Sequence, residues 1–110
     1  MAAEIARKMP IRSREIALNS DWTGWTFTAR TNPTMATLDD LVSGKYGRII
    51  DALDQLVITW NFVDEEGQPL DLVTARKENA SRALMGKLTL DLAMEMTKSL
   101  SEAITTPDPK

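Results

Sequence analysis

The sequence predicts an α+β fold in which a small antiparallel β-sheet packs against C-terminal α-helices. Apolar residues alternate with polar ones at residues 12–18 and 24–30, a pattern typical of half-buried strands. Branched and aromatic side chains fill residues 56–63, as in a more deeply buried strand. After residue 70 the apolar positions recur every three or four residues, as on one face of an amphipathic helix.

The first two predicted strands are expected to pair as a hairpin. Ile16 and Leu18 alternate with polar neighbours in the strand at 12–18, and aromatic residues alternate with threonines in the strand at 24–30. The loop at 19–24 contains Asn-Ser-Asp, which is turn chemistry. A short loop between two alternating segments favours antiparallel pairing.

Two helices are expected before the third strand. Thr37 can cap a short helix that continues to Val42, and Gly44 is suited to stop it. The apolar positions of residues 46–55 follow steps of three, four and seven, so a second helix is predicted there.

The third strand, at 56–63, is the clearest in the chain. Strict alternation places four large apolar side chains on one of its faces: Leu56, Ile58, Trp60 and Phe62. The segment at 64–67 predicts a tight turn, because Gly67 is free to take a positive φ. Residues 68–70 can then return as a brief edge strand.

Two helices are predicted in the rest of the chain. Asp71 or Thr74 caps the first, at 74–86. Thr89 is placed to begin the second, at 89–104.

Five of the six aromatic residues lie on or beside the predicted strands. They are Trp22, Trp25, Phe27, Trp60 and Phe62. Large rings bury much surface and pack in pairs, so we expect one core cluster with Trp60 buried in it.

At 110 residues, the chain is long enough for one domain. We expect that domain at residues 11–104, between a flexible N-terminus at 1–10 and a disordered tail at 105–110. No apolar stretch has the length of a secretory signal or a membrane span. We therefore expect no membrane partner and a cytoplasmic location.

The composition removes several classes of chemistry. The chain has no histidine and no cysteine, which excludes thiol nucleophiles, imidazole bases and zinc fingers. Its net charge of −3 disfavours nucleic-acid binding, which needs clustered basic residues. Adjacent acids at 39–40 and 64–66 do not have the spacing of a catalytic carboxylate pair. We expect a protein that is not an enzyme and has no metal site and no cofactor.

The C-terminal helices offer a candidate partner surface. Leu90 and Met94 lie off the main apolar line of the last helix, and flexible leucine and methionine side chains suit adaptable binding. We interpret Leu90, Met94 and Leu100 as candidate partner-binding residues. The alternative is that all three simply cover the sheet.

The run from Trp60 to Leu70 reads W-N-F-V-D-E-E-G-Q-P-L. This run resembles a pattern found in the tail assembly chaperone family of long-tailed bacteriophages and prophages. The residues that carry the resemblance are Trp60, Asn61, Asp64, Gly67 and Pro69. A weaker similarity lies in Arg12–Glu15 followed by Trp22–Trp25.

The resemblance implies a role in binding rather than catalysis. Members of the family bind the tape measure protein in the host cytoplasm while major tail (tube) subunits assemble around it, and the family has no catalytic residues. Two other readings stay open: a structural virion component, such as a tail-tube or head–tail connector subunit, or a bacterial adaptor or regulatory module. A homo-oligomer is compatible with all three.

Overall fold

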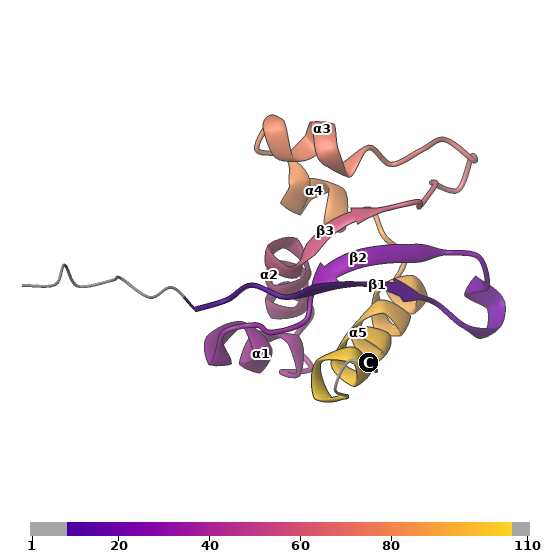
Figure 1. The fold of residues 1–110 in the computed structure, drawn as a ribbon. Coiled ribbons are helices and arrows are strands. Elements are labelled where there is room, and N and C mark those ends of the chain that lie inside the picture. The colour runs from indigo at the N-terminus through magenta and orange to yellow at the C-terminus, as the bar shows by residue number, and fades with distance from the viewer. Residues whose placement is uncertain (1–8, 107–110) are drawn as a thin grey trace, which may run out of the picture.

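The computed structural model describes residues 9–106 and shows the predicted α+β fold (Figure 1). Strands β1 (Ser13–Ala17), β2 (Thr26–Arg30) and β3 (Val57–Trp60) form an antiparallel sheet in that order. The helices are α1 (Met35–Leu41), α2 (Tyr46–Leu56), α3 (Leu72–Lys77), α4 (Ser81–Met85) and α5 (Leu90–Thr105). A 3₁₀ turn spans Ser20–Trp22.

The chain ends match the predicted boundaries only in part. Thr105 is the last residue of α5, so the helix continues one residue into the predicted tail. Met9 and Pro10 are exposed and have no regular structure. The remainder of the predicted flexible N-terminus and tail, residues 1–8 and 107–110, lies outside the described residues.

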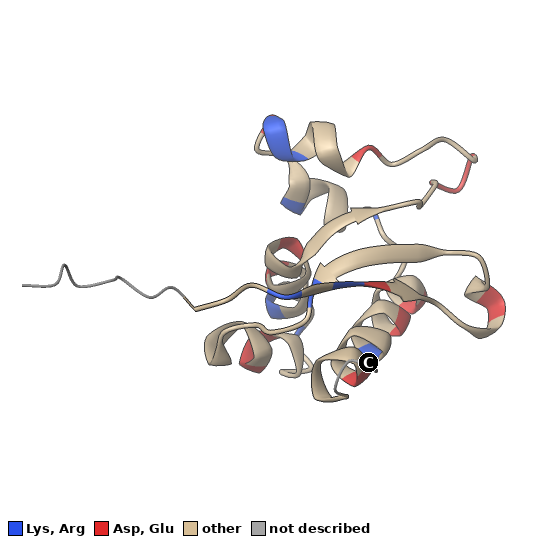
Figure 2. Cartoon of the chain, in the orientation of Figure 1, with Lys and Arg blue, Asp and Glu red and all other residues tan. Residues whose placement is uncertain are grey.

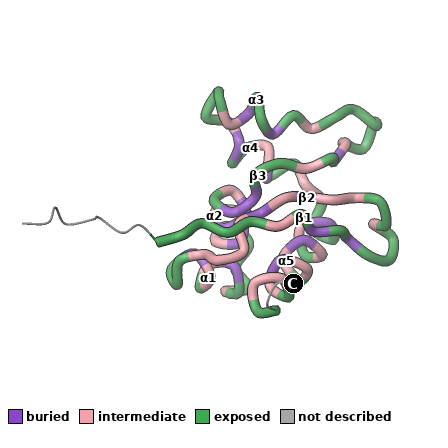
Figure 3. The backbone as a smooth tube through the Cα atoms, viewed as in Figure 1, coloured by how far each residue is buried: buried purple, intermediate pink, exposed green. Residues whose placement is uncertain are grey.

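The sheet and the helices form two layers. Figure 1 shows α2 and α5 behind the sheet, and the core joins Phe27 and Val57 of the strands to Leu53 and Met96 of these helices. Among residues 9–106 no helix covers the opposite face of the sheet, and the strands are coloured mainly exposed or intermediate in Figure 3. An antiparallel sheet tolerates one solvated face when that face is polar.

The structure confirms the β1–β2 hairpin. Ile16 lies opposite Phe27, and the Leu18 N–H donates to the Trp25 carbonyl at 2.9 Å. Ile16 and Leu18 are buried, as their alternation predicts. Gly24 closes the loop with φ of +95°, a conformation that side-chain-bearing residues rarely adopt.

Strand β3 departs from the predicted alternation because it contains a bulge. Thr28 lies opposite Thr59, but Ala29 lies opposite Val57, so Ile58 is an extra residue on β3. The core side chain is therefore Val57, at 1% exposure, whereas Ile58 is 46% exposed. The prediction that Ile58 shares one face with Leu56 and Phe62 is wrong, because those two side chains are buried. The regular strand also ends at Trp60 rather than Val63.

The helix around residues 35–41 starts earlier than predicted. Its N-cap is Thr34, whose side-chain oxygen accepts from the Thr37 N–H at 3.2 Å, so the assignment of Thr37 as the cap is wrong. Thr37 is buried and its hydroxyl donates to Gln55 Oε1 at 3.1 Å, which joins α1 to α2.

The single helix predicted at 74–86 is two short helices, α3 and α4. Asn79, between them, has φ of +55°, which no α-helix accommodates. Asp71 is the N-cap of α3 and accepts from the Thr74 N–H at 3.0 Å. Arg76 stabilises the turn between α3 and α4 by donating to the Val57 carbonyl and to Ser81 Oγ.

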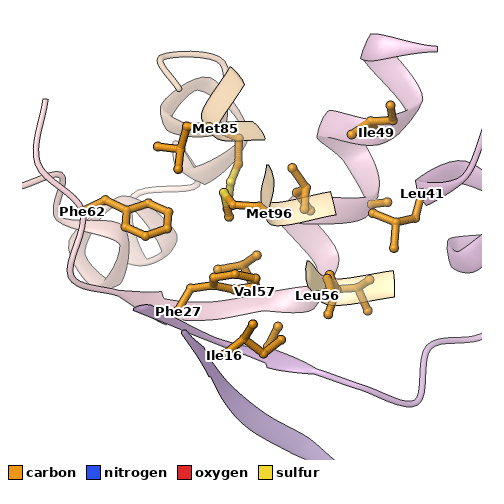
Figure 4. Packing of buried hydrophobic residues seen from close by; sticks show 14 of the residues in the cluster. Ile16, Phe27, Leu41, Ile49, Leu56, Val57, Phe62, Met85 and Met96 are labelled. Carbon is orange, nitrogen blue, oxygen red and sulfur yellow. The ribbon is translucent and has the colours of Figure 1, made fainter. Parts of the chain in front are cut away.

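The aromatic cluster is confirmed. Trp22 contacts Trp25, Trp25 contacts Phe62, and Phe62 stacks on Trp60 at a centroid distance of 4.7 Å. Trp60 itself is half-buried rather than buried. Figure 4 shows how Phe27 and Phe62 lie in the core with Val57, Met85 and Met96.

Candidate interaction site

We call the segment 60–70 the motif hairpin. Its polar side chains form hydrogen bonds within the chain. Asn61 Oδ1 accepts from the Thr26 N–H at 2.8 Å, and Asn61 Nδ2 donates to the Gly24 carbonyl at 3.0 Å. The Trp60 indole N–H donates to the Leu70 carbonyl at 2.7 Å. Trp60 and Asn61 therefore fasten the motif hairpin to its own return strand and to β2.

The turn of the motif hairpin is equally constrained. Asp64 Oδ1 accepts from the N–H groups of Glu66 and Gln68, each at 2.9 Å. Gly67 has φ of +81°, as the turn prediction requires. Pro69 bridges to Val63, at a position between the two cross-strand hydrogen bonds of the hairpin. All five residues that carry the resemblance thus have a structural role.

The three candidate partner-binding residues do not share one environment. Leu90 is 54% exposed and Met94 is 42% exposed, whereas Leu100 is 0% exposed. Leu100 packs in the core, so its interpretation as a partner-binding residue is corrected: the Leu92, Met96 and Leu100 stripe of α5 faces the sheet. Leu90 and Met94 lie outside that stripe and stay at the surface.

Leu90 and Met94 line an apolar groove of about 170 Å³ between α2, α4 and α5. We call this groove the interaction groove. Its opposite wall carries Tyr46 and Ile50 of α2, and Tyr46 is 62% exposed. Met85 and Leu88 also line it. Isolated exposed apolar residues are common on proteins, whereas here apolar residues from separate elements converge on one concavity.

Tyr46 and Ile50 are the residues that sequence reasoning missed. Ile50 belongs to the helical pattern of 46–55, and that pattern alone assigns it to the core. One local signal pointed to them: α2 carries more apolar residues than a single narrow core-facing stripe contains. Their position opposite Leu90, about forty residues later, requires the tertiary structure.

Ion pairs link α2 to the helices beside it, α4 and α1. Arg82 of α4 contacts Asp51 of α2 at 2.5 Å, and Arg48 of α2 contacts Asp39 and Asp40 of α1. The hydrogen bond to Asp51 raises the Arg82 pKa above its ordinary value. Such exposed pairs add little stability, so the position of α2 depends mainly on its buried face. Figure 2 shows acidic and basic positions on α2 and on the helices beside it.

Residues 9–106 contain no group of three or more His, Cys, Asp or Glu side chains that could hold a metal ion. The helices in the same range are too short and too polar to cross a membrane.

Comparison with known proteins gives no relative for this chain. No protein-family profile, no curated protein sequence and no solved structure matches it.

Proposed function

We propose that this protein is a phage tail assembly chaperone. It binds the tape measure protein in the host cytoplasm while major tail subunits polymerise around it, and it performs no catalysis. The proposal combines the resemblance of residues 60–70 with the presence of a surface suited to a helical partner.

The interaction groove is the observation that carries the proposal. Leu90, Met94 and Tyr46 surround a concave apolar surface bounded by helices. Such a groove can accept the apolar face of an amphipathic helix, with side chains spaced three or four residues apart. A long helical client has many such faces that need cover before assembly.

Co-expression with the tape measure protein of the same genome tests the proposal. The expected result is co-purification of the two chains and a larger soluble fraction of the tape measure protein, because its apolar helical faces are covered. Unchanged solubility together with no co-purification contradicts the proposal.

A matched pair of variants makes this experiment specific to the groove. Leu90→Asp puts a charge in the first turn of α5, where an acid is tolerated by the helix, and should abolish co-purification. Val73→Asp makes a similar change in the first turn of α3, at 52% exposure and outside the interaction groove. It should co-purify like the unmodified chain, and equal losses in both variants count against the groove.

A structural virion component is the second candidate, favoured by the outer strand of the sheet. β1 pairs with β2 on one side, and among the described residues no strand pairs with its other side. Subunits of a tube can use such an edge for pairing between copies. Mass spectrometry of purified particles separates the candidates, because a tube subunit is present in stoichiometric amounts and a chaperone is nearly absent.

A further inference from the structure

A second apolar pocket shares the Leu88 wall with the interaction groove. It has a volume of about 240 Å³, and Trp22 and Trp25 line it from the β1–β2 loop. Leu70 and Leu92 line it from the motif hairpin and from α5. We call it the indole pocket. The proposed function does not use it.

The two indoles form a fixed aromatic wall. Their ring centroids are 5.1 Å apart and their planes are inclined by 82°, which is an edge-to-face arrangement. Trp25 is also packed against Phe62 at 5.3 Å. Both tryptophans remain half-buried, so part of each ring is accessible. Indole faces that are fixed and partly exposed are suited to a cation, which the negative face of the ring attracts.

Two acidic residues, Asp64 and Glu65, line the same pocket. Asp64 is held in place because one of its oxygens accepts two N–H groups of the turn. Glu65 is exposed, and within residues 9–106 its carboxylate has no hydrogen bond or ion pair. The pocket therefore offers one oriented carboxylate and one without a counter-charge.

The loops at this end of the molecule reinforce the negative charge. Figure 2 shows red but no blue in the β1–β2 loop and in the turn of the motif hairpin. The acids are Asp21, Asp64, Glu65 and Glu66, and neither 19–24 nor 64–67 contains a lysine or arginine. Four like charges around a tryptophan-lined concavity favour a cationic occupant and disfavour an anionic one.

We propose that the indole pocket receives one lysine or arginine side chain of a partner polypeptide. The aliphatic stem of that side chain would lie against Leu70 and Leu92, while its charged head would meet the indole faces and the two carboxylates. This inference goes beyond the proposed function, since it does not depend on which partner fills the interaction groove.

Lys87 provides a test of the proposed preference of the pocket for a positive charge. It also lines the pocket, and no ion pair joins it to Asp64 or Glu65 among the residues described. Its charge repels a cationic ligand. Removing that charge should therefore strengthen binding, whereas removing the charge of Glu65 should weaken it.

The indole N–H signals of the three tryptophans in a ¹H–¹⁵N spectrum provide a direct measurement. The probe is a blocked tripeptide, acetyl-Ala-Arg-Ala-amide, and its comparison is the citrulline peptide, which has nearly the same shape without the charge. We expect saturable shifts at Trp22 and Trp25 but not at Trp60, which does not line the pocket. The citrulline peptide should bind at least about tenfold more weakly.

Single-charge variants locate the effect. Glu65→Gln should weaken arginine-peptide binding about twofold to fivefold, and Lys87→Gln should strengthen it. Glu66→Gln is the matched control, because Glu66 is the next residue of the same turn but does not line the pocket. Equal binding of the two peptides, shifts that never saturate, or equal effects of Glu65→Gln and Glu66→Gln would each overturn the proposal.

Discussion

The motif hairpin and the interaction groove differ in what their side chains contact. In the motif hairpin, Asn61 and Asp64 each use their side chain in two hydrogen bonds to the backbone. In the groove, Leu90 and Met94 expose apolar surface. Asn61 and Asp64 therefore hold the fold together through their side chains, while the apolar side chains exposed in the interaction groove lie elsewhere in the chain. A shared motif of this kind predicts architecture more directly than it predicts a binding surface.

The largest expected effect is on the buried ring of the motif hairpin. Phe62→Ala removes a side chain that is 1% exposed and packs against Trp25, Phe27 and Trp60. The free energy of unfolding should fall by about 3–5 kcal/mol, as measured by urea denaturation. A loss below about 1 kcal/mol would show that the motif hairpin is not part of the core. The contrast between a structural hairpin and an exposed groove would then not hold.

The turn of the motif hairpin should be the next most sensitive position. Gly67→Ala forces a side chain onto a residue with φ of +81°, so we expect a loss of about 1–2 kcal/mol in urea denaturation. Gly47→Ala is the matched control. Gly47 lies inside α2 with open space around it, and alanine there should stabilise by up to about 1 kcal/mol. Equal signs for the two variants contradict the assigned backbone constraint.

The N-cap of α3, next to the motif hairpin, should have a smaller effect on stability, and this effect should depend on pH. Hydrogen bonds from the Thr74 hydroxyl and then from the Thr74 N–H lower the pKa of Asp71. A carboxyl whose folded-state pKa is lowered stabilises the fold above its unfolded pKa, and this stability is lost as the pH falls through the folded value. Asp71→Asn retains a capping oxygen and does not titrate. Its stability should therefore fall less than that of the unmodified chain between about pH 5 and about pH 3, and parallel urea-denaturation profiles would contradict this.

The smallest stability effect is expected in the interaction groove. Met94→Asp changes a side chain that is 42% exposed, so the loss should stay below about 1 kcal/mol and the melting temperature should barely move, while partner binding falls. Met35→Asp, at 89% exposure in the first turn of α1, is the same substitution outside the groove and should leave both unchanged. A large loss of stability for Met94→Asp would place this residue in the core and would break the comparison.

The sequence predicts the parts of this fold in which one local signal decides the outcome. Alternation at Ile16 and Leu18 predicts the first strand, and Gly67 predicts the turn of the motif hairpin. Leu90 and Met94 could be separated from the core stripe by helical periodicity alone, and both are exposed. In these cases the local preference and the tertiary structure agree.

The remaining features depend on contacts between distant residues. The bulge at Ile58 results from the pairing of β3 with Thr28 and Ala29. The alternation of residues within a single strand does not predict it. The break between α3 and α4 contains neither glycine nor proline, and its only local signal is the tolerance of Asn79 for a positive φ. Leu100 is a different case, because helical periodicity already places it on the stripe with Leu92 and Met96, and that stripe is buried against the sheet.

The contact between Arg14 and the end of α5 has a consequence for the order of folding. Arg14 of β1 donates to the carbonyls of Ala103 and Thr106, across separations of 89 and 92 residues, whereas neighbouring strands of the sheet follow one another along the chain. Closing a long loop costs more conformational entropy than closing a hairpin, so the sheet can form early and α5 docks late. Leu90 and Met94 arrive with α5. The interaction groove is therefore complete only after α5 has docked.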